Sequence, residues 1–292
     1  MASGTGPQST RWRRRILAAL LGLLVFLAAY TAAALVRFDH ELRQLHEGLY
    51  LEPDLGEGAP VRFASLRRPT EIWHPITLRE AGRFVVPAIL TAEDRRFHSH
   101  WGLDPLAIGR ALLRNIQARR VVEGGSTITQ QVVKNVLFPG GGSPFIRKTT
   151  EILLAPVIDW RHGKAKILET YLNIVYFGHQ GGVAVRGVGA AAHVYLDKPP
   201  AQLGPAEAAL LAQMIPAPAR YAPDRDRATA RARRNDLLER MHERGVINQR
   251  TLAAALRQPV EVRSVSAAQL HFGQYFAQAV RRELQRPEGV SR

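Results

Sequence analysis

An uncharged apolar segment near the N-terminus constrains this chain more than any other feature. Residues 16–36 are 21 consecutive positions without a charged side chain. As a helix, a segment of this length would span roughly 31 Å, which matches the hydrocarbon core of a bilayer. Four arginines among residues 11–15 directly precede it, and positive charge is retained on the cytoplasmic side. We therefore expect one transmembrane helix, with the N-terminus inside and the larger C-terminal part translocated.

A cleaved signal peptide is the alternative for this segment. Its apolar region is usually about 7 to 15 residues long, which is shorter than the segment found here. The small residues Ala32, Ala33 and Ala34 could nevertheless mimic a cleavage site. We favour retention of the segment as an anchor.

The remaining sequence indicates one folded domain with appendages. The apolar fraction of 46% and the charged fraction of 22% are those of a globular protein. Long segments rich in Ala, Leu, Ile and Arg follow Pro87 without alternation, which favours packed helices over sheets. The chain has no cysteine, so disulfides and thiolate metal sites are excluded. We predict a cytoplasmic basic segment at 1–15, the membrane helix at 16–36, a stalk at 37–79, a folded domain at 80–245 and a helical extension at 246–292.

The basic character of the chain does not indicate a nucleic-acid partner. The formal net charge is +15, but part of this charge flanks the anchor. A translocated domain is also separated from the cellular DNA by the membrane. A basic surface there suits anionic lipid headgroups or a phosphorylated substrate, although a solvated basic face is an equal alternative. Lys134, Lys148 and Lys164 lie within the motifs described below, and lysine is a compact point charge suited to phosphate oxygens.

Glu93 is the first candidate for chemistry. It follows Pro87, which favours the first turn of a helix, and it is four residues from both Ile89 and Phe97. Helical neighbours at that spacing share a face, so the carboxylate would lie between apolar side chains. Burial there would raise its pKa toward values useful in acid–base catalysis. An ordinary surface glutamate is the alternative if this segment is taken alone.

A second segment, residues 124–135, predicts the start of a helix with a polar face. Two glycines precede hydroxyl residues that are able to cap a helix. Thr127, Gln131 and Lys134 fall within about 60° of arc on that helix. An apolar stripe lies elsewhere on it, at Ile128, Val132 and Val136. Uncharged hydrogen-bonding groups with one lysine suit a sugar or an anion, and an exposed polar face is the alternative.

Two further segments do not by themselves indicate a catalytic or binding role. Arg147 and Glu151 are four residues apart on an expected helix, and by itself this spacing indicates a surface ion pair. Pro156 should kink or end that helix near Ala155. The polar residues of the segment 164–173 are expected to stabilise the fold.

The four segments contain extended motifs in a fixed order. They are Glu-Asp-x-x-Phe-x-x-His-x-Gly at 93–102, Gly-x-Ser-Thr-Ile-Thr-Gln-Gln-x-x-Lys-Asn at 124–135, Arg-Lys-x-x-Glu at 147–151 and Lys-x-x-Ile-Leu-Glu-x-Tyr-Leu-Asn at 164–173. In this order they resemble the glycosyltransferase domain of the peptidoglycan polymerases, the penicillin-binding-protein type known as glycosyltransferase family 51. The likeness covers about residues 80–225. Departures at Pro156 and at 186–189 affect the expected local helix geometry, not the expected chemistry.

The resemblance implies a mainly α, lysozyme-like fold behind the membrane helix. It also implies an enzyme that polymerises lipid II, the undecaprenyl-pyrophosphoryl disaccharide-pentapeptide, into glycan strands of the bacterial cell wall. Glu93 would be the general base on the acceptor hydroxyl, and undecaprenyl pyrophosphate would leave with inversion. Glu151 would be the second catalytic carboxylate, orienting basic groups or a metal. The implied substrate-binding positions are Asp94, Phe97, His100, Thr127, Gln131, Lys134, Asn135, Arg147 and Lys148. The implied structural positions of the motifs are Gly124, Ser126, Lys164, Glu169, Tyr171 and Asn173.

The same resemblance carries expectations for cofactors and partners. No cofactor is required by the sequence, and it contains no ligand cluster of defined spacing that would settle whether Mg²⁺ or Mn²⁺ is used. The expected partners are lipid II, the growing glycan strand and membrane lipid at the bacterial inner membrane, together with transpeptidases and other cell-wall synthesis proteins. The segment 271–284 has the pattern of an amphipathic helix. The chain contains no Ser-x-x-Lys motif, so no transpeptidase activity is expected from it.

Two other functions remain as alternatives. Paired carboxylates also serve glycosidases, so a lysozyme-like muramidase or lytic transglycosylase is the first of them. Such an enzyme would have no pyrophosphate to bind, and hence no need for Lys134, Arg147 and Lys148. An inactive membrane scaffold that binds cell-wall enzymes is the second, and the completeness of the motifs argues against it.

Overall fold

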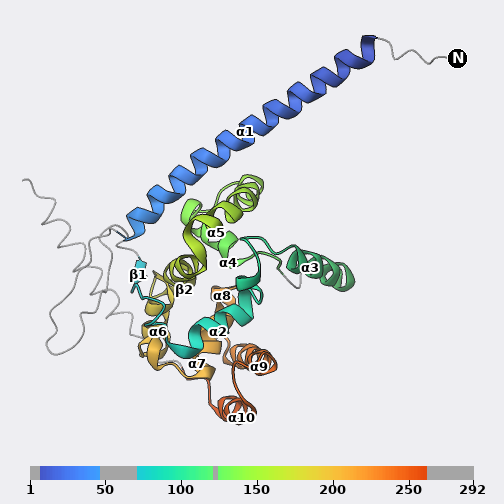
Figure 1. The fold of residues 1–292 in the computed structure, drawn as a ribbon. Coiled ribbons are helices and arrows are strands. Elements are labelled where there is room, and N and C mark those ends of the chain that lie inside the picture. Colours follow the sequence, from blue (N-terminus) through green and yellow to red (C-terminus); the bar gives the residue numbers. More distant parts are fainter. Residues whose placement is uncertain (1–6, 47–70, 121–123, 262–292) are drawn as a thin grey trace, which may run out of the picture.

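The computed structural model describes residues 7–46, 71–120 and 124–261. The predicted helix at 271–284 lies outside these ranges. The described elements are α1 (Pro7–His46), β1 (Glu71–Trp73), α2 (Gly82–Glu93), η1 (Phe97–Ser99), α3 (Pro105–Ala118), α4 (Ile128–Leu137), α5 (Pro144–Ile174), β2 (Tyr176–Gln180), β3 (Val183–Arg186), α6 (Val188–Leu196), η2 (Pro200–Gln202), α7 (Pro205–Met214), α8 (Pro218–Tyr221), α9 (Arg227–Glu243) and α10 (Gln249–Arg257). The predicted mainly helical class is confirmed (Figure 1).

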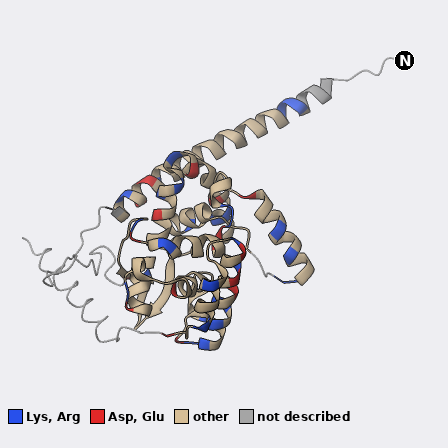
Figure 2. Ribbon diagram, turned by 60° about the horizontal axis from the view of Figure 1, so that its bottom comes forward, with Lys and Arg blue, Asp and Glu red and all other residues tan. Residues whose placement is uncertain are grey.

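The helix α1 carries the uncharged segment and extends beyond it at both ends. Within the described residues it is the one helix long and apolar enough to cross a membrane, with a mean hydropathy of 2.4 over its most apolar window. Its first half stands away from the rest of the molecule, and Figure 2 shows its long stretch without charged residues. It continues ten residues past position 36, into the segment predicted as a stalk.

The last part of α1 is packed onto the folded domain. Phe38 and Leu42 are buried in the core, and Arg37 donates a hydrogen bond of 3.1 Å to the carbonyl of Leu137. The carboxylate of Asp39 pairs with Arg161 at 3.0 Å. Further up the helix, inside the predicted span, the hydroxyl groups of Tyr30 and Thr150 lie 2.5 Å apart. The anchor and the domain are therefore joined by side-chain contacts as well as by the chain.

Two groups of packed helices form the domain (Figure 1). In one, α7 is central, because eight of its ten residues are buried and it packs against both α2 and α9. A helix that is apolar on every side belongs inside a core. In the other group α4 packs along α5. The predicted apolar stripe of Ile128, Val132 and Val136 is confirmed, since all three side chains are buried against this neighbour.

A small three-stranded sheet joins residues far apart in sequence. Its order is β1-β3-β2, with β1 parallel and β2 antiparallel to β3. Glu71 on β1 forms an ion pair of 2.7 Å with Arg186 on β3. The short strand β1 thus fixes the segment that leads into α2.

The helix α5 corrects the expectation at Pro156. The prediction that the helix kinks or ends near Ala155 is wrong, because the helical conformation continues past Pro156 and the kink that divides α5 (Pro144–Ile174) lies at Gly163. Its non-helical residue is Gly163, with φ 71° and ψ 162°, a conformation that glycine adopts readily. Leu154, Ala155 and Ile158 are buried around the proline. Core packing on both sides of Pro156 therefore outweighs the loss of one backbone donor.

Candidate active site

Glu93 is the last residue of α2, at the edge of a cavity of about 530 Å³. Its carboxylate accepts a hydrogen bond of 2.8 Å from the side-chain amide of Gln131 on α4. The amide oxygen of Gln131 in turn accepts a hydrogen bond of 3.2 Å from the hydroxyl of Tyr171 on α5. Three helices therefore hold the carboxylate in a defined orientation.

Burial raises the pKa of Glu93 above the ordinary glutamate value. The hydrogen bond from Gln131 and the charges of Lys134 and Arg233 act in the opposite direction, and the neighbouring charge of Asp94 raises the pKa further. Desolvation outweighs the favourable contacts, which is the effect expected from the sequence. A carboxylate with a raised pKa is a stronger base than an exposed one, so Glu93 suits proton abstraction near neutral pH.

The local structure around Glu93 differs from the expectation in one respect. The prediction that a helix begins near Pro87 is wrong, because α2 begins at Gly82 and Pro87 lies inside it. Val85, Ala88 and Ile89 are buried on both sides of the proline, and this packing stabilises the upstream turn. Since α2 ends at Glu93, Phe97 follows in η1 and does not share a helical face with the carboxylate.

Other residues of the first motif hold the second motif in place. Asp94 is buried, and its carboxylate lies 3.0 Å from the Nε2 atom of His100 and accepts a hydrogen bond of 2.9 Å from the backbone N–H of Ile128. Asp94 lines the cavity. Phe97 and His100 are buried and do not line it. Their contacts are with Asp94 in the case of His100 and with the ammonium group of Lys164 in the case of Phe97.

Thr127 begins α4 as the sequence predicts. Its hydroxyl accepts from the backbone N–H of Gln130, whose side chain accepts from the N–H of Thr127, forming a capping box. The same hydroxyl donates a hydrogen bond of 2.6 Å to the carbonyl of Gly102. Gly124, Ser126, Thr127 and Gln131 all line the cavity. The second motif therefore supplies one wall of it.

A basic cluster made of Lys134, Arg147 and Lys148 surrounds the buried carboxylate of Glu151. Lys148 pairs with Glu151 at 2.9 Å and also donates a hydrogen bond of 2.9 Å to the hydroxyl of Ser126. Arg147 lies 3.6 Å from the other carboxylate oxygen. Burial lowers the pKa of Lys134, while the charges of Glu151 and Glu93 oppose this shift. Lys134 thus lies within electrostatic reach of both predicted catalytic carboxylates, and Asn135 is half-buried beside it.

The fourth motif stabilises the fold, as expected. Lys164 lies 2.7 Å from Asp159, which also accepts a hydrogen bond of 2.8 Å from Thr129. The ammonium group of Lys164 is 4.6 Å from the centre of the Phe97 ring. Glu169 accepts from the backbone N–H of Leu78 at 3.2 Å. Asn173 bonds both backbone groups of Ile76 at 2.8 Å, so this motif fastens the segment before α2.

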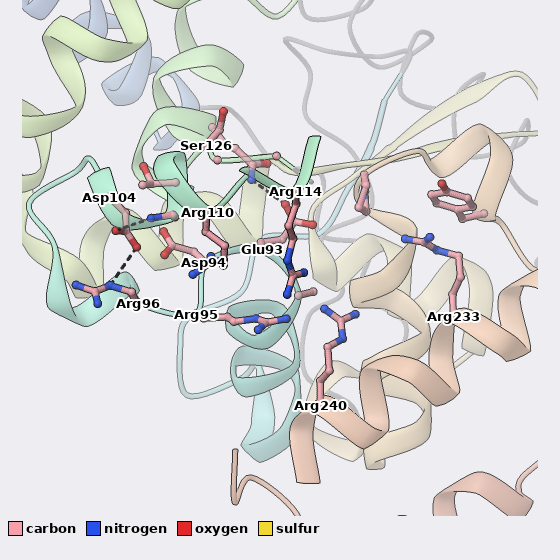
Figure 3. A pocket seen from close by; sticks show the side chains of 18 residues that line it. Glu93, Asp94, Arg95, Arg96, Asp104, Arg110, Arg114, Ser126, Arg233 and Arg240 are labelled. Carbon is pink, nitrogen blue, oxygen red and sulfur yellow. Dashed lines mark hydrogen bonds and ion pairs between the residues drawn. The ribbon is translucent and has the colours of Figure 1, made fainter. Parts of the chain in front are cut away.

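Arginines that the motifs do not specify also line the cavity (Figure 3). Arg110 and Arg114 come from α3 and Arg233 and Arg240 from α9, all outside the motifs, while Arg95 and Arg96 occupy variable positions of the first motif between α2 and η1. The planar group of Arg233 stacks 3.7 Å from the ring centre of Tyr221, another lining residue. In the sequence, only spacing could have indicated that these arginines share a face of their helices. Arg110 and Arg114 are one helical turn apart, and Arg233 and Arg240 are two turns apart.

The described residues contain no group of three His, Asp or Glu side chains that could hold a metal ion. Glu151 is paired with two basic side chains.

Comparison with known proteins identifies a family. Residues 63–242 match the family model described as Transglycosylase. Penicillin-binding protein 1B of Vibrio cholerae is 39% identical over 194 residues, covering 66% of this chain and 25% of that protein. Penicillin-binding protein 1A of Aquifex aeolicus is 40% identical over 206 residues, covering 70% of this chain and 27% of that protein. This chain thus spans about a quarter of the length of the curated relatives that it matches.

The motifs quoted from the sequence and the residues that line the cavity, the half-buried Glu93 among them, all fall within the matched residues. The chain belongs to the transglycosylase family, glycosyltransferase family 51, and the described part of the matched region is mainly helical, as its motifs implied.

Proposed function

We propose that this chain is a peptidoglycan glycosyltransferase, which polymerises lipid II into glycan strands. The observation that supports this most is the placement of Glu93. Its carboxylate faces the cavity with a raised pKa, and it lies within the electrostatic influence of Lys134 in the basic cluster around Glu151. A base next to a site for anionic oxygens is what transfer from a sugar pyrophosphate requires.

The proposed step transfers one glycosyl group. The carboxylate of Glu93 accepts the proton of the acceptor 4-hydroxyl as that oxygen attacks the anomeric carbon of the growing chain. A new carbon–oxygen bond forms with inversion, and the bond to the pyrophosphate oxygen breaks. Undecaprenyl pyrophosphate leaves with the electron pair, and Lys134, Arg147 and Lys148 stabilise its charge. Glu151 holds Lys148 in place through the 2.9 Å contact.

A membrane location fits a lipid-linked substrate. The contact between Tyr30 and Thr150 joins the predicted membrane span to the residue before Glu151. Large apolar side chains are also exposed on α3 and at the start of α5, including Leu112, Leu113, Ile116 and Phe145. Exposed apolar side chains of this kind are typical of a surface that contacts lipid. We propose a single pass through the bacterial inner membrane, with the N-terminus cytoplasmic, the domain outside, and transpeptidases and other cell-wall enzymes as neighbours.

The hydrolase alternative makes a different demand on the same site. A muramidase or lytic transglycosylase would cleave a neutral glycosidic bond and would release no pyrophosphate. The cluster of Lys134, Arg147 and Lys148 would then have no ligand. An inactive scaffold would in turn have no use for a base whose pKa is raised by burial.

A product assay with purified lipid II tests the proposal. We expect the full chain in detergent to convert lipid II into glycan strands, resolved as a ladder on a gel, and to leave isolated sacculi intact. Soluble fragments released from sacculi, with lipid II unconsumed, would favour the hydrolase. We propose that no cofactor is needed, and parallel reactions with Mg²⁺, Mn²⁺ or a chelator test this.

The pH dependence of the reaction follows from the raised pKa of Glu93. The base acts in its deprotonated form, so activity should fall as the pH drops through that raised pKa, above the acid limb of an ordinary glutamate. Gln131 lowers this pKa through its hydrogen bond. Gln131→Met should therefore move the acid limb of kcat/KM to higher pH. An acid limb at the same pH in both proteins would show that Glu93 does not govern it.

A further inference from the structure

Basic side chains are arranged in two separate groups around Glu93. The basic cluster of Lys134, Arg147 and Lys148 comes from α4 and α5 and does not line the cavity. The cavity is lined instead by Arg110 and Arg114 of α3 and by Arg233 and Arg240 of α9. We call these four residues the arginine rim. The proposed reaction accounts for the basic cluster and leaves the arginine rim without a role.

The arginine rim surrounds one space. Figure 3 shows Arg114 and Arg240 extending toward one another from α3 and α9, with Arg233 reaching in from the same side as Arg240. Arg233 is close enough to Glu93 for its charge to lower the pKa of that carboxyl. Two helices that are distant in sequence therefore bring guanidinium groups together beside the catalytic carboxylate.

The acids of the cavity do not balance this charge. Six arginines line it, against the three acids Glu93, Asp94 and Asp104. Asp94 is engaged with His100 and the N–H of Ile128. Asp104 caps α3 and pairs with Arg96 at 3.2 Å. Converging positive charges repel one another, so the arrangement is most stable with an anion between them.

The side chains of the rim are held but keep donors for a ligand. Arg233 uses its Nε–H on the amide oxygen of Gln213, 3.1 Å away, and stacks on Tyr221. Arg240 pairs with Asp236, an exposed residue on its own helix, at 3.0 Å. Arg110 and Arg114 have partners as well. A guanidinium has five N–H donors, so one partner leaves several of them available.

The type of cation in each group indicates the type of anion. The basic cluster contains two lysines, whereas the cavity lining contains no lysine among its described residues. A guanidinium presents a planar fork that matches the two oxygens of a carboxylate. If the proposed function holds, the saccharide substrate carries a peptide stem, and any unblocked peptide ends in a carboxylate. The strand being elongated brings one such group for each stem.

We propose that the arginine rim binds the carboxylates of the peptide stems on the saccharide substrate, as a subsite separate from the pyrophosphate-binding basic cluster. This inference rests on the proposed function and adds a specificity determinant to it. The rim would hold the stem beside the cavity while Glu93 acts on the sugar. It would thereby select substrates by the charge of the stem.

The test compares two lipid II substrates, one with the terminal stem carboxylate free and one with it converted to the amide. For the full chain we expect KM to be about tenfold lower for the free carboxylate, a typical effect of one charge-assisted contact. In Arg114→Gln/Arg240→Gln this preference should shrink to about twofold or less, because KM for the free carboxylate rises toward KM for the amide. Arg114→Lys/Arg240→Lys should retain part of it, because charge remains while the fork is lost.

The matched control is Arg231→Gln/Arg257→Gln. These two exposed arginines lie on α9 and α10 outside the cavity, and the change in net charge is the same. The preference should survive in this variant. Thermal unfolding checks that both double variants are folded, and the single variants Arg114→Gln and Arg240→Gln replace the double one if it is not.

The outcomes separate the two proposals. If the rim variant weakens both substrates equally, the rim binds phosphate or supports the fold, and the stem subsite is wrong while the polymerase assignment stands. If the wild-type chain polymerises both substrates with one KM, the stem subsite is again wrong. If it polymerises neither, the proposed function itself fails.

Discussion

Replacing Glu93 with glutamine should lower the rate of lipid II polymerisation by roughly 10²- to 10⁴-fold, the usual contribution of a general base. Glutamine has nearly the same shape, and its amide oxygen can still accept the 2.8 Å hydrogen bond from Gln131. The fold and the affinity for substrate should therefore be retained. The measurement is the initial rate of glycan formation, together with binding of lipid II or of a moenomycin-type inhibitor to the same protein.

Glu239→Gln serves as the control for this substitution. Glu239 is an exposed residue of α9 that does not line the cavity, so its replacement removes the same charge without touching the site. Its rate should match that of the unchanged chain. Turnover by Glu93→Gln at the rate of the control would sink the assignment of Glu93 as the base.

Gly102→Ala should destabilise the fold strongly, although it adds only one methyl group. Gly102 has φ +79°, and a Cβ atom there would lie 2.2 Å from the carbonyl oxygen of Ala155 and 2.8 Å from the nitrogen of Pro156. Both obstacles are backbone atoms of α5, so they cannot turn aside. Adding backbone strain to overpacking gives an expected loss of roughly 3 kcal/mol or more. A large fall in Tm, followed by circular dichroism in detergent, is the readout.

Gly245→Ala separates the two causes of that loss. Gly245 has a similar φ of +71°, but no atom lies within 4 Å of the position where its Cβ would be. Its replacement should therefore lose about 1 kcal/mol from backbone strain alone. If the two variants unfolded at the same temperature, the close approach of Gly102 to α5 would not be a determinant of stability.

Local signals in the sequence predict parts of this molecule well. The uncharged run before position 36 gives α1, because a charge would be costly in a bilayer and none occurs. Thr127 gives the start of α4, because a hydroxyl side chain satisfies a backbone donor that the first turn leaves open. In both cases interactions among a few neighbouring residues determine where the helix lies in the sequence.

Tertiary packing explains where local signals fail. Pro156 and Pro87 each indicate a helix boundary in isolation, yet both lie inside helices whose flanking residues are buried. The arginine rim was not predicted for a different reason. Arginines at helical spacing look alike whether they face water or a cavity, and only the placement of α3 opposite α9 decides which. The candidate site could therefore be predicted at Glu93 and the basic cluster but not at its second wall.

The continuity of α1 gives the anchor a rotational requirement. Tyr30 contacts Thr150 from within the membrane span, and Phe38 is buried in the core eight residues later on the same helix. One residue inserted between them would turn Tyr30 by about 100° relative to the domain and carry it away from its partner. Insertions of seven residues would nearly restore the phase. The contacts between α1 and the domain therefore depend on the rotation of the helix as much as on its length, whereas a flexible linker would tolerate changes in both.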